Sequence, residues 1–297
     1  MSPSKQDTIR TCKPIWLRRR LPSGPEYERI RLLLAGRGLT TVCQEAMCPN
    51  LFECFADGTA TFMILGESCS RRCGFCAVGN TPQGPPDPAE PQRVAEAVTL
   101  LDLDYAVVTS VTRDDLEDGG AALFAATIRA IHQSRPRSLV EVLIPDLQGN
   151  WQALATIIAA RPRVLNHNIE TVPRLYPQVR PQAIYRRSLE LLRRAREIDP
   201  QIAIKSGLML GLGESLEELE EVWSDLREAG CDILTMGQYL QPTADNLEVK
   251  RFVDPDEFIR LREQALAAGF SGVAAGPFVR SSYQAEQLYR QVRRQGT

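Results

Sequence analysis

The chain alternates short apolar runs with amphipathic stretches from about residue 61 onward. An apolar run of about four to eight residues between turn formers is typical of a buried strand, and a longer amphipathic stretch is typical of a helix. This alternation predicts a parallel sheet built from strand–helix units. The expected strands are Thr61–Leu65, Tyr105–Thr109, Leu139–Ile144, Val164–Ile169, Ile202–Met209 and Ile233–Gln238.

Helix and loop boundaries can be read at three places. Ser215-x-x-Glu218 is a capping box, and Asp254-Pro255 opens a helix that Gly269 closes. The proline-rich stretch Thr81–Pro91 predicts a loop, because proline continues neither a helix nor a strand ladder.

Composition and charge agree with a soluble enzyme. With 297 residues and 43% hydrophobic content, the chain can bury one substantial core. The net charge of −2 does not indicate binding to nucleic acid or to a membrane surface. No apolar run approaches the roughly 20 residues that are needed to span a bilayer. The first residues lack an apolar signal region. We therefore expect a cytoplasmic protein, whose thiols stay reduced.

Six of the eight cysteines form two triplets of different spacing: Cys43, Cys48 and Cys54, then Cys69, Cys73 and Cys76. Thiolates select iron–sulfur clusters, zinc or cuprous copper. The loop from Cys69 to Cys76 is short enough to wrap three thiolates around one face of a cubic cluster, which leaves the fourth iron open for a ligand. A three-thiolate zinc site or buried free thiols would be the alternative, but zinc sites usually add histidines or a second cysteine pair, and only His132 and His167 exist.

The first triplet is less specific by itself. It is one ligand short of a closed structural site, and a zinc knob or an electron-relay cluster would also use it. Cys12 and Cys231 lie outside both triplets and are expected to be ordinary thiols.

The pattern Cys-x3-Cys-x-aromatic-Cys, with Phe75 before the last cysteine, resembles the signature of radical S-adenosylmethionine (SAM) enzymes. The resemblance implies that Cys69, Cys73 and Cys76 hold a 4Fe-4S cluster whose open iron chelates the amino and carboxylate groups of SAM. A donated electron then cleaves SAM to methionine and a 5′-deoxyadenosyl radical.

Both triplets together with Arg280-Ser281-Ser282-Tyr283 closely resemble the lipoyl synthase family. The resemblance covers roughly positions 12 to 285, including the blocks Lys13–Leu17, Glu45–Asn50, Thr112–Gly120, Asn166–Glu170 and Lys205–Gly211. It implies an α/β fold: a partial (β/α)6 TIM-like barrel at residues 61–275, an N-terminal extension at 1–60 and a C-terminal extension at 276–297. A full eight-stranded barrel is the alternative architecture.

The same resemblance implies an auxiliary 4Fe-4S cluster held by Cys43, Cys48, Cys54 and Ser282. A serine alkoxide is harder and more readily protonated than a thiolate, which suits a cluster that is dismantled as a sulfur donor. Arg280 would hold cluster sulfide or substrate, or form a surface salt bridge.

Polar residues fall at the carboxyl ends of the expected strands, where barrel active sites collect. Their agreement across separate strands favours a shared ligand over unrelated turns. We expect Asn168 and Glu170 to bond the ribose of SAM, since a carboxylate accepts two hydroxyl protons and an amide both donates and accepts. Ser110 and the Asp118–Gly120 segment are expected to face the methionine amino group.

Three further positions have two interpretations each. Gly211-x-Gly213 lets backbone approach the adenine or sugar, or simply makes a turn. Lys205 would meet a carboxylate of the cofactor, or form a partly buried ion pair. His167 would donate a hydrogen bond beside the site, or serve as a structural histidine.

The reaction that the resemblance implies is insertion of sulfur at C6 and C8 of an octanoyl chain on a lysine of a lipoyl carrier domain. The carriers would be 2-oxoacid dehydrogenase E2 subunits and the glycine cleavage H protein, with ferredoxin or flavodoxin as electron donor. Such C–H bonds have no acidic proton, so a radical is needed. The arginines at 18–20 are expected to be solvated surface, with contact to an acidic carrier as the weaker alternative.

Two other function classes stay open at this point. Another radical SAM enzyme, such as a methylthiotransferase or a maturase, would use the extra cluster to bind substrate, but its added nucleic-acid domain or different cysteine spacing is not found here. A non-catalytic cluster protein would have little use for an open-iron motif at the mouth of a barrel.

Overall fold

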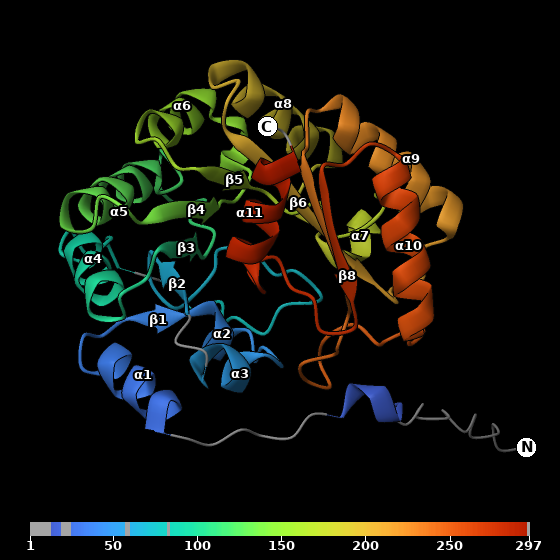
Figure 1. The fold of residues 1–297 in the computed structure, drawn as a ribbon, viewed down its shortest axis with the longest axis horizontal. Coiled ribbons are helices and arrows are strands. Elements are labelled where there is room, and N and C mark those ends of the chain that lie inside the picture. The colour runs from blue at the N-terminus through green and yellow to red at the C-terminus, as the bar shows by residue number, and fades with distance from the viewer. Residues whose placement is uncertain (1–12, 19–24, 57–59, 82–83, 296–297) are drawn as a thin grey trace, which may run out of the picture.

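The computed structural model describes residues 13–18, 25–56, 60–81 and 84–295 (Figure 1). Its centre is an eight-stranded sheet whose strands follow one another in chain order. β1 pairs antiparallel with β2, and every later neighbour pair is parallel. The strands are β1 Thr40–Thr41, β2 Thr61–Ile64, β3 Tyr105–Ser110, β4 Leu139–Leu143, β5 Val164–Asn166, β6 Ala203–Leu210, β7 Ile233–Gln238 and β8 Gly272–Gly276.

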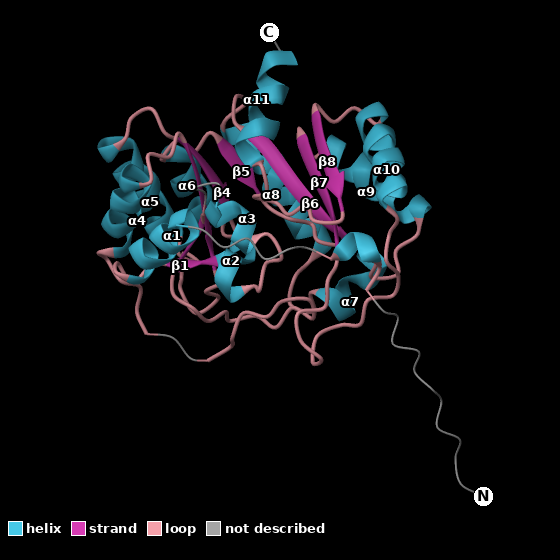
Figure 2. Cartoon of the chain, turned by 60° about the horizontal axis from the view of Figure 1, so that its bottom comes forward, coloured by secondary structure: helices cyan, strands magenta, loops and turns pink. Residues whose placement is uncertain are grey.

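Helices cover the outside of the curved sheet, one after most strands (Figures 1 and 2). These outer helices are α4 Glu90–Leu100, α5 Ala121–Ser134, α6 Trp151–Ala159, α8 Tyr185–Ile198, α9 Leu216–Glu228 and α10 Pro255–Ala267. Shorter elements complete the chain: 3-10 turns at Ile15–Leu17, Leu147–Gly149 and Pro173–Leu175, and α1 Pro25–Ala35, α2 Val42–Glu45, α3 Leu51–Ala56 and α7 Tyr176–Val179. No helix in the described part of the chain has both the length and the apolar content needed to traverse a bilayer.

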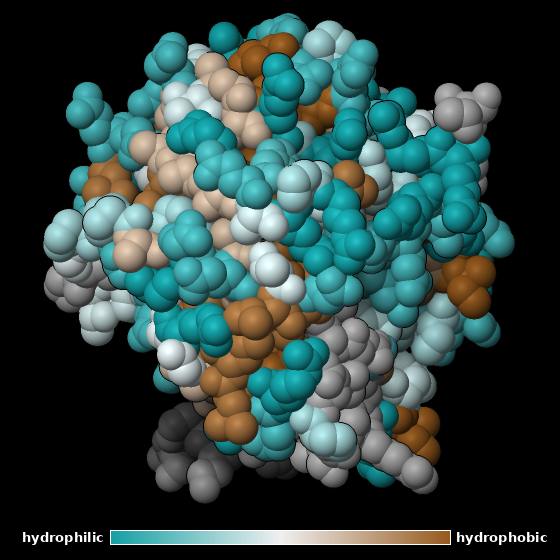
Figure 3. All heavy atoms as spheres, turned by 60° about the vertical axis from the view of Figure 1, so that its left-hand side comes forward, coloured by the Kyte–Doolittle hydropathy of each residue, from teal (hydrophilic) through white to brown (hydrophobic). Residues whose placement is uncertain are grey.

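Burial on both faces explains the apolar strands. All six residues of β7 are buried, as expected for a parallel strand that is covered on each side. The outer helices present polar residues to solvent, and Figure 3 shows a largely hydrophilic face with smaller hydrophobic areas. Ser215 and Glu218 form the predicted capping box of α9, and the Asp254 side chain caps α10, which begins at Pro255.

The six predicted strands and the partial barrel are confirmed, with two additions. β8 joins the sheet as a seventh parallel strand, and the two-residue β1 lies at the opposite edge. The sheet is open, because β1 and β8 end the strand order and no pairing joins them among the described residues. The strand predicted at Val164–Ile169 is shorter than expected, since the chain leaves the ladder after Asn166.

The last helix, α11 Ala285–Gln295, fills the amino-terminal end of the barrel interior (Figure 1). Its buried Ala285, Leu288 and Tyr289 form a separate apolar cluster with the inward-facing residues Tyr105, Val107, Val164, Ala203 and Ile233. The rings of Tyr105 and Tyr289 lie 6.0 Å apart. A Cβ on Gly272 would lie 2.3 Å from Val292, so glycine is required there for α11 to approach β8. The C-terminal segment is thus anchored inside the fold.

Candidate functional site

The loop from Cys69 to Cys76 follows β2 at the carboxyl edge of the sheet and is held from two distant segments. The Gly74 N–H donates to Val179 O at 2.9 Å, and the Asn246 side chain donates to Cys76 O at 2.9 Å. A Cβ on Gly74 would lie 2.8 Å from Gln178 O, so only glycine fits. These contacts with distant segments fix the shape of the loop.

The thiols of this loop lie close to one another. Burial raises the pKa of Cys73 to about 12 and that of Cys76 to about 11, and the neighbouring Cys69 raises both further. The Cys69 sulfur accepts two backbone hydrogen bonds, from Arg71 N at 3.4 Å and Thr112 N at 3.3 Å. Hydrogen bonds to the ligating sulfurs are one factor that sets the reduction potential of an iron–sulfur cluster.

The donor set fits a cluster better than a single metal ion. In the residues the structure describes, no three His, Cys, Asp or Glu side chains converge on one metal ion. A cubic cluster binds its thiolates at separate corners, so its ligands stand farther apart than those around one zinc ion. Three neighbouring thiols with amide donors to sulfur match this requirement.

Arg71, inside the cysteine loop, ties the loop to the barrel by buried ion pairs. Its guanidinium lies 2.6 Å from Asp114 and 2.6 Å from Asp146, and Arg187 lies 2.7 Å from Asp146. Burial opposes ionisation of Asp146, but Arg71 and Arg187 outweigh it and lower the pKa of this carboxyl. The pairs fix the loop against the segments that follow β3 and β4.

Asn168 and Glu170 lie just beyond β5, where the backbone is strained. Glu170 has φ +67°, held by its N–H to Gly207 O at 2.9 Å and by Met209 N–H to its carbonyl at 2.9 Å. Asn168 Nδ2 donates to Glu170 Oε1 at 3.0 Å. Burial raises the pKa of Glu170, although Arg180 works against this. Non-glycine residues held in this conformation concentrate at functional sites.

Ser110 ends β3 with a buried hydroxyl that has no hydrogen-bond partner among the described residues. Buried polar groups are rarely left without a partner, so an orphaned hydroxyl at this edge fits a ligand that supplies one. Elsewhere at this edge, glycine at 207 leaves room for the Asn168 side chain, since a Cβ there would lie 2.8 Å from Asn168 Oδ1.

Lys205 and His167 have protein partners away from this edge. Lys205 Nζ donates to Glu141 Oε1 at 2.8 Å, both side chains being 1% exposed, and Tyr105 donates to the other oxygen of Glu141. His167 has its ring nitrogens 2.8 Å from Ile144 O and 2.9 Å from Ser188 Oγ. Burial lowers the pKa of His167 to about 4. The structure therefore gives Lys205 a buried ion pair and His167 a structural role.

The glycine-containing segments also have local explanations. The Asp118 carboxylate accepts the N–H groups of Gly120 and Ala122, both at 2.8 Å, at the start of α5. Gly211, at φ +95°, lies against Gln238 Nε2 and Arg251 O, which a Cβ would meet at 2.3 and 2.4 Å. Contacts within the protein thus account for the conformation of both segments.

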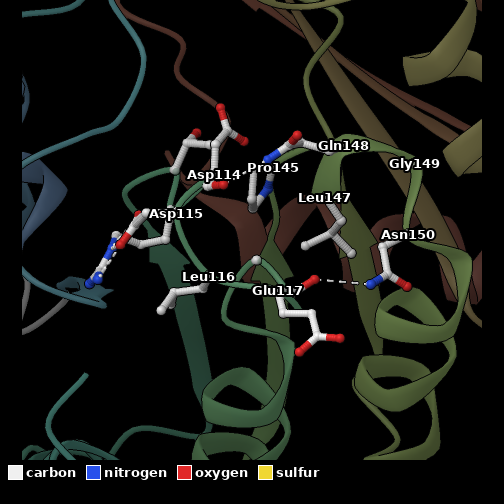
Figure 4. Close-up of a pocket in the computed structure, with 12 residues that line it drawn as sticks. Asp114, Asp115, Leu116, Glu117, Pro145, Leu147, Gln148, Gly149 and Asn150 are labelled. Atoms are coloured by element: carbon white, nitrogen blue, oxygen red, sulfur yellow. Dashed lines mark hydrogen bonds and ion pairs between the residues drawn. The ribbon is translucent and has the colours of Figure 1, made fainter. Parts of the chain in front are cut away.

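A pocket of about 550 Å³ opens between the segments after β3 and β4 (Figure 4). It is lined by residues of 112–119 and 145–150, and the Asn150 side chain donates to Glu117 O across it at 3.1 Å. The pocket contains Asp114 but neither the cysteines nor Asn168 and Glu170. It adjoins the site through the Arg71–Asp114 ion pair.

Arg180 belongs to the site and was missed by sequence reasoning. It is 8% exposed and donates to Asn168 O at 2.8 Å, with its guanidinium 5.4 Å from the Tyr176 ring centre. Its charge acts on both Cys73 and Glu170 and lowers the pKa of each, against their burial. Arg180 stands in no recognisable motif, so no signal in the sequence could have found it.

The first cysteine triplet lies in and around α2 and α3. Burial raises the pKa of Cys43 to about 11, with the nearby Cys48 adding to the effect. Cys48 N–H donates to Cys43 O at 3.0 Å, and Cys54 N–H to Asn50 O at 2.9 Å. These bonds fold the triplet into one compact unit.

The C-terminal segment reaches this unit from the far end of the chain. The Asn50 side chain donates to Phe278 O at 2.6 Å, and the Tyr283 hydroxyl donates to Glu53 Oε1 at 2.6 Å. Ser282 lies between these two anchors. The structure therefore brings the serine motif to the elements that carry the cysteines.

Comparison with known proteins defines the class. The model of the Radical SAM superfamily matches residues 63–226, more than half of the chain. Solved structures with a similar fold include methylornithine synthase (PylB), with a TM-score of 0.50 at 13% identity over 93% of this chain and 90% of that one. The [FeFe]-hydrogenase maturase HydG has a TM-score of 0.56 at 14% identity, over 77% of this chain and 54% of its own. The chain is thus a radical SAM protein.

Curated relatives identify the family. Lipoyl synthase of Desulfotalea psychrophila is 65% identical over 97% of both chains. Lipoyl synthase of Methylococcus capsulatus is 57% identical over 93% of this chain and 86% of its own, and that of Symbiobacterium thermophilum is 55% identical over 96% and 89%. The chain belongs to the lipoyl synthase family, radical SAM sulfurtransferases that use SAM and 4Fe-4S clusters.

Proposed function

We propose that this chain inserts two sulfur atoms, at C6 and C8, into an octanoyl group carried by a lysine of a partner protein. Cys69, Cys73 and Cys76 would hold the cluster that binds SAM. Cys43, Cys48, Cys54 and Ser282 would hold the auxiliary 4Fe-4S cluster, which is consumed as the sulfur substrate. The radical SAM barrel would span 61–275, with the auxiliary ligands in the extensions at 1–60 and 276–297.

The observation that carries this proposal is the path of the C-terminal segment. Tyr283 bonds Glu53 in α3, while Ser281 lies 2.6 Å from the Asn168 side chain at the edge of the barrel. Ser282 therefore lies between the contact to α3 and the contact to the barrel edge that would bind SAM. A sulfur donor next to the place where a carbon radical forms needs this proximity.

The side chains at the barrel edge would bind and orient SAM. Glu170 accepts from a ribose hydroxyl, and Asn168 Oδ1 accepts from the other. The orphaned Ser110 hydroxyl would bond the methionine end, and Phe75 would pack beside the cluster. Arg180 would hold the backbone of Asn168 and offset negative charge near Cys73. Lys205 bonds Glu141, and Gly211 packs against Gln238. Both residues would stabilise the barrel edge without contacting SAM directly.

Bound at a reduced cluster, SAM supplies a 5′-deoxyadenosyl radical, which removes a hydrogen atom that no side-chain base could take. The role of the protein is then to exclude water and hold the octanoyl carbon between the two sites. Ser282 would favour release of its iron as sulfur leaves, because an alkoxide accepts a proton more readily than a thiolate.

The carriers that fit this reaction are lipoyl domains of 2-oxoacid dehydrogenase E2 subunits and the glycine cleavage H protein. The electron would come from ferredoxin or flavodoxin, and the reaction would take place in the cytoplasm, where thiols remain reduced. Arg18 is exposed, as a solvated arginine should be, whereas residues 19 and 20 lie outside the described residues.

The test is an anaerobic assay of the reconstituted protein with SAM, dithionite and an octanoyl-lysine peptide, followed by mass spectrometry. We expect a mono-thiolated and then a dithiolated product, together with deoxyadenosine. The variant Ser282→Ala should form deoxyadenosine but lose most thiolated product, while Ser271→Ala, on an exposed turn before β8, should match the wild type. Deoxyadenosine without any thiolated product from the wild type would reject the substrate, and wild-type sulfur insertion by Ser282→Ala would reject the serine ligand.

A further inference from the structure

The two adjacent serines of the C-terminal segment have different surroundings. Ser281 Oγ lies 2.6 Å from Asn168 Nδ2 and 2.9 Å from Asn168 Oδ1. The Ser282 hydroxyl, by contrast, has no hydrogen-bond partner within the described ranges. Among the described residues, the barrel thus holds Ser281 but not Ser282, whose hydroxyl is the one available as a ligand.

The bonds of Asn168 determine which way its amide points. An ionised carboxylate only accepts hydrogen bonds, so the nitrogen of the amide faces Glu170. The second hydrogen of Nδ2 then points to Ser281 Oγ. The amide oxygen lies within reach of the same hydroxyl and keeps its second acceptor position for a ligand hydroxyl. Glu170 therefore sets the orientation of the amide, and Ser281 holds the amide in place where a ribose would meet it.

The chain crosses between two sites within four residues. On the barrel side, Ser281 bonds Asn168, and the charge of Arg280 lowers the pKa of Glu170 against its burial. On the other side, Tyr283 bonds Glu53 in α3. Ser282 lies between them, one peptide unit or about 3.8 Å from Ser281. A shift of Ser281 cannot leave Ser282 in place.

We propose that Ser281 is a positioning residue that couples SAM binding at Asn168 to ligation of the auxiliary cluster by Ser282. The inference rests on the proposed function and adds a link between its two sites. SAM that is bound to Asn168 would hold Ser281, and through the backbone Ser282, in the ligating position. Because such coupling is reciprocal, ligation by Ser282 would strengthen SAM binding by the same factor.

The test is a double-mutant cycle on ligand affinity, which does not depend on turnover. The dissociation constant of S-adenosylhomocysteine is measured calorimetrically on the anaerobic protein with both clusters, for wild type, Ser281→Ala, Ser282→Ala and the double variant. We expect Ser281→Ala to weaken binding by about 2- to 10-fold, the value of one net hydrogen bond. Ser282→Ala should weaken binding several-fold alone and not at all once Ser281→Ala is present.

Controls separate the coupling from a structural effect. Ser281→Thr keeps a hydroxyl and should retain the coupling, and Ser271→Ala should behave as wild type. In wild type, S-adenosylhomocysteine should also shift the Mössbauer signal of the serine-bound iron, and this shift should vanish in Ser281→Ala. The coupling would be overturned if the two serine substitutions had additive effects on the free energy of S-adenosylhomocysteine binding. It would also be overturned if the Mössbauer shift persisted in Ser281→Ala. Failure of the wild type to bind the ligand would instead overturn the proposed function.

Discussion

The loop from Cys69 to Cys76 and the unit that carries Cys43, Cys48 and Cys54 are built in opposite ways. The loop follows a buried strand and is fixed by the Arg71 ion pairs. The unit consists of the short helices α2 and α3 and is completed by a segment 228 to 230 residues away. The difference suits their proposed roles, because a cluster that cleaves SAM persists through turnover, whereas a sulfur donor must be dismantled and rebuilt.

Removing a ligand from each region gives the largest expected effects. Cys69→Ala should abolish deoxyadenosine formation, since three thiolates are needed around the cluster, and should leave about half of the iron. Cys48→Ala should lose a similar share of iron but still cleave SAM, without sulfur insertion. Iron analysis and deoxyadenosine assays on both variants check this, and Cys231→Ala, a buried cysteine away from both triplets, is the control for loss of a thiol. Equal loss of SAM cleavage in the two variants would contradict the separation of roles.

Arg71→Gln should destabilise the barrel and the cysteine loop together. The substitution removes one of the two arginines that pair with Asp146, 0% exposed; because Arg187 remains, the loss should be at or below the lower end of the about 3–5 kcal/mol that a fully uncompensated buried charge costs. Denaturant unfolding measures the loss. The matched control is Arg193→Gln on α8, whose exposed ion pairs with Glu190 and Glu197 should contribute little. Equal unfolding midpoints for the two variants would mean that the Arg71 pairs do not support the loop.

The contrast between the regions also explains what the sequence could predict. Apolar strands and cysteine spacing are local signals, so six strands and both triplets could be identified directly. β8 was missed because Gly272–Gly276 has the sequence Gly-Val-Ala-Ala-Gly, which carries little strand signal. The burial of α11 inside the barrel depends on long-range packing, which no periodicity encodes.

Site residues divide in the same way. Asn168 and Glu170 were predicted from polar residues at strand ends; the structure joins their side chains by a hydrogen bond, and their contact with SAM stays a prediction. Lys205 follows the same pattern, yet its side chain reaches Glu141, 64 positions earlier, and such a pairing cannot be read from one sequence. Arg180 could not be predicted from the sequence, because only the fold brings it close to Asn168 and Cys73.

The buried His167 should give the barrel a measurable pH dependence. Its folded pKa of about 4 lies below the ordinary value of 6.5, so between these pH values the unfolded chain binds a proton that the folded chain does not. Stability should therefore fall as pH drops from 6.5 to 4, with a slope of up to about 1.4 kcal/mol per pH unit from this group. His167→Gln should reduce that slope in denaturant unfolding, whereas His132→Gln, on α5 and only half buried, should reduce it less. Identical slopes for wild type and His167→Gln would contradict the prediction.

The smallest expected effect tests how the auxiliary region is held. Tyr283→Phe removes the hydrogen bond to Glu53 and keeps the ring, so global stability should fall by only about 1 kcal/mol. Because this bond ties the C-terminal segment directly to α3, hydrogen exchange in α3 should nevertheless accelerate clearly, while deoxyadenosine formation stays at the wild-type level.

Tyr185→Phe provides the matched control, since it removes a similar bond, 2.7 Å to Asp225, between α8 and α9. It should cost comparable stability without changing exchange in α3. If both variants left α3 equally protected, the unit would be held by its own packing rather than by the C-terminal segment. The opposite result, faster exchange only in Tyr283→Phe, would mean that the two ends of the chain hold the auxiliary region together while the barrel stays intact.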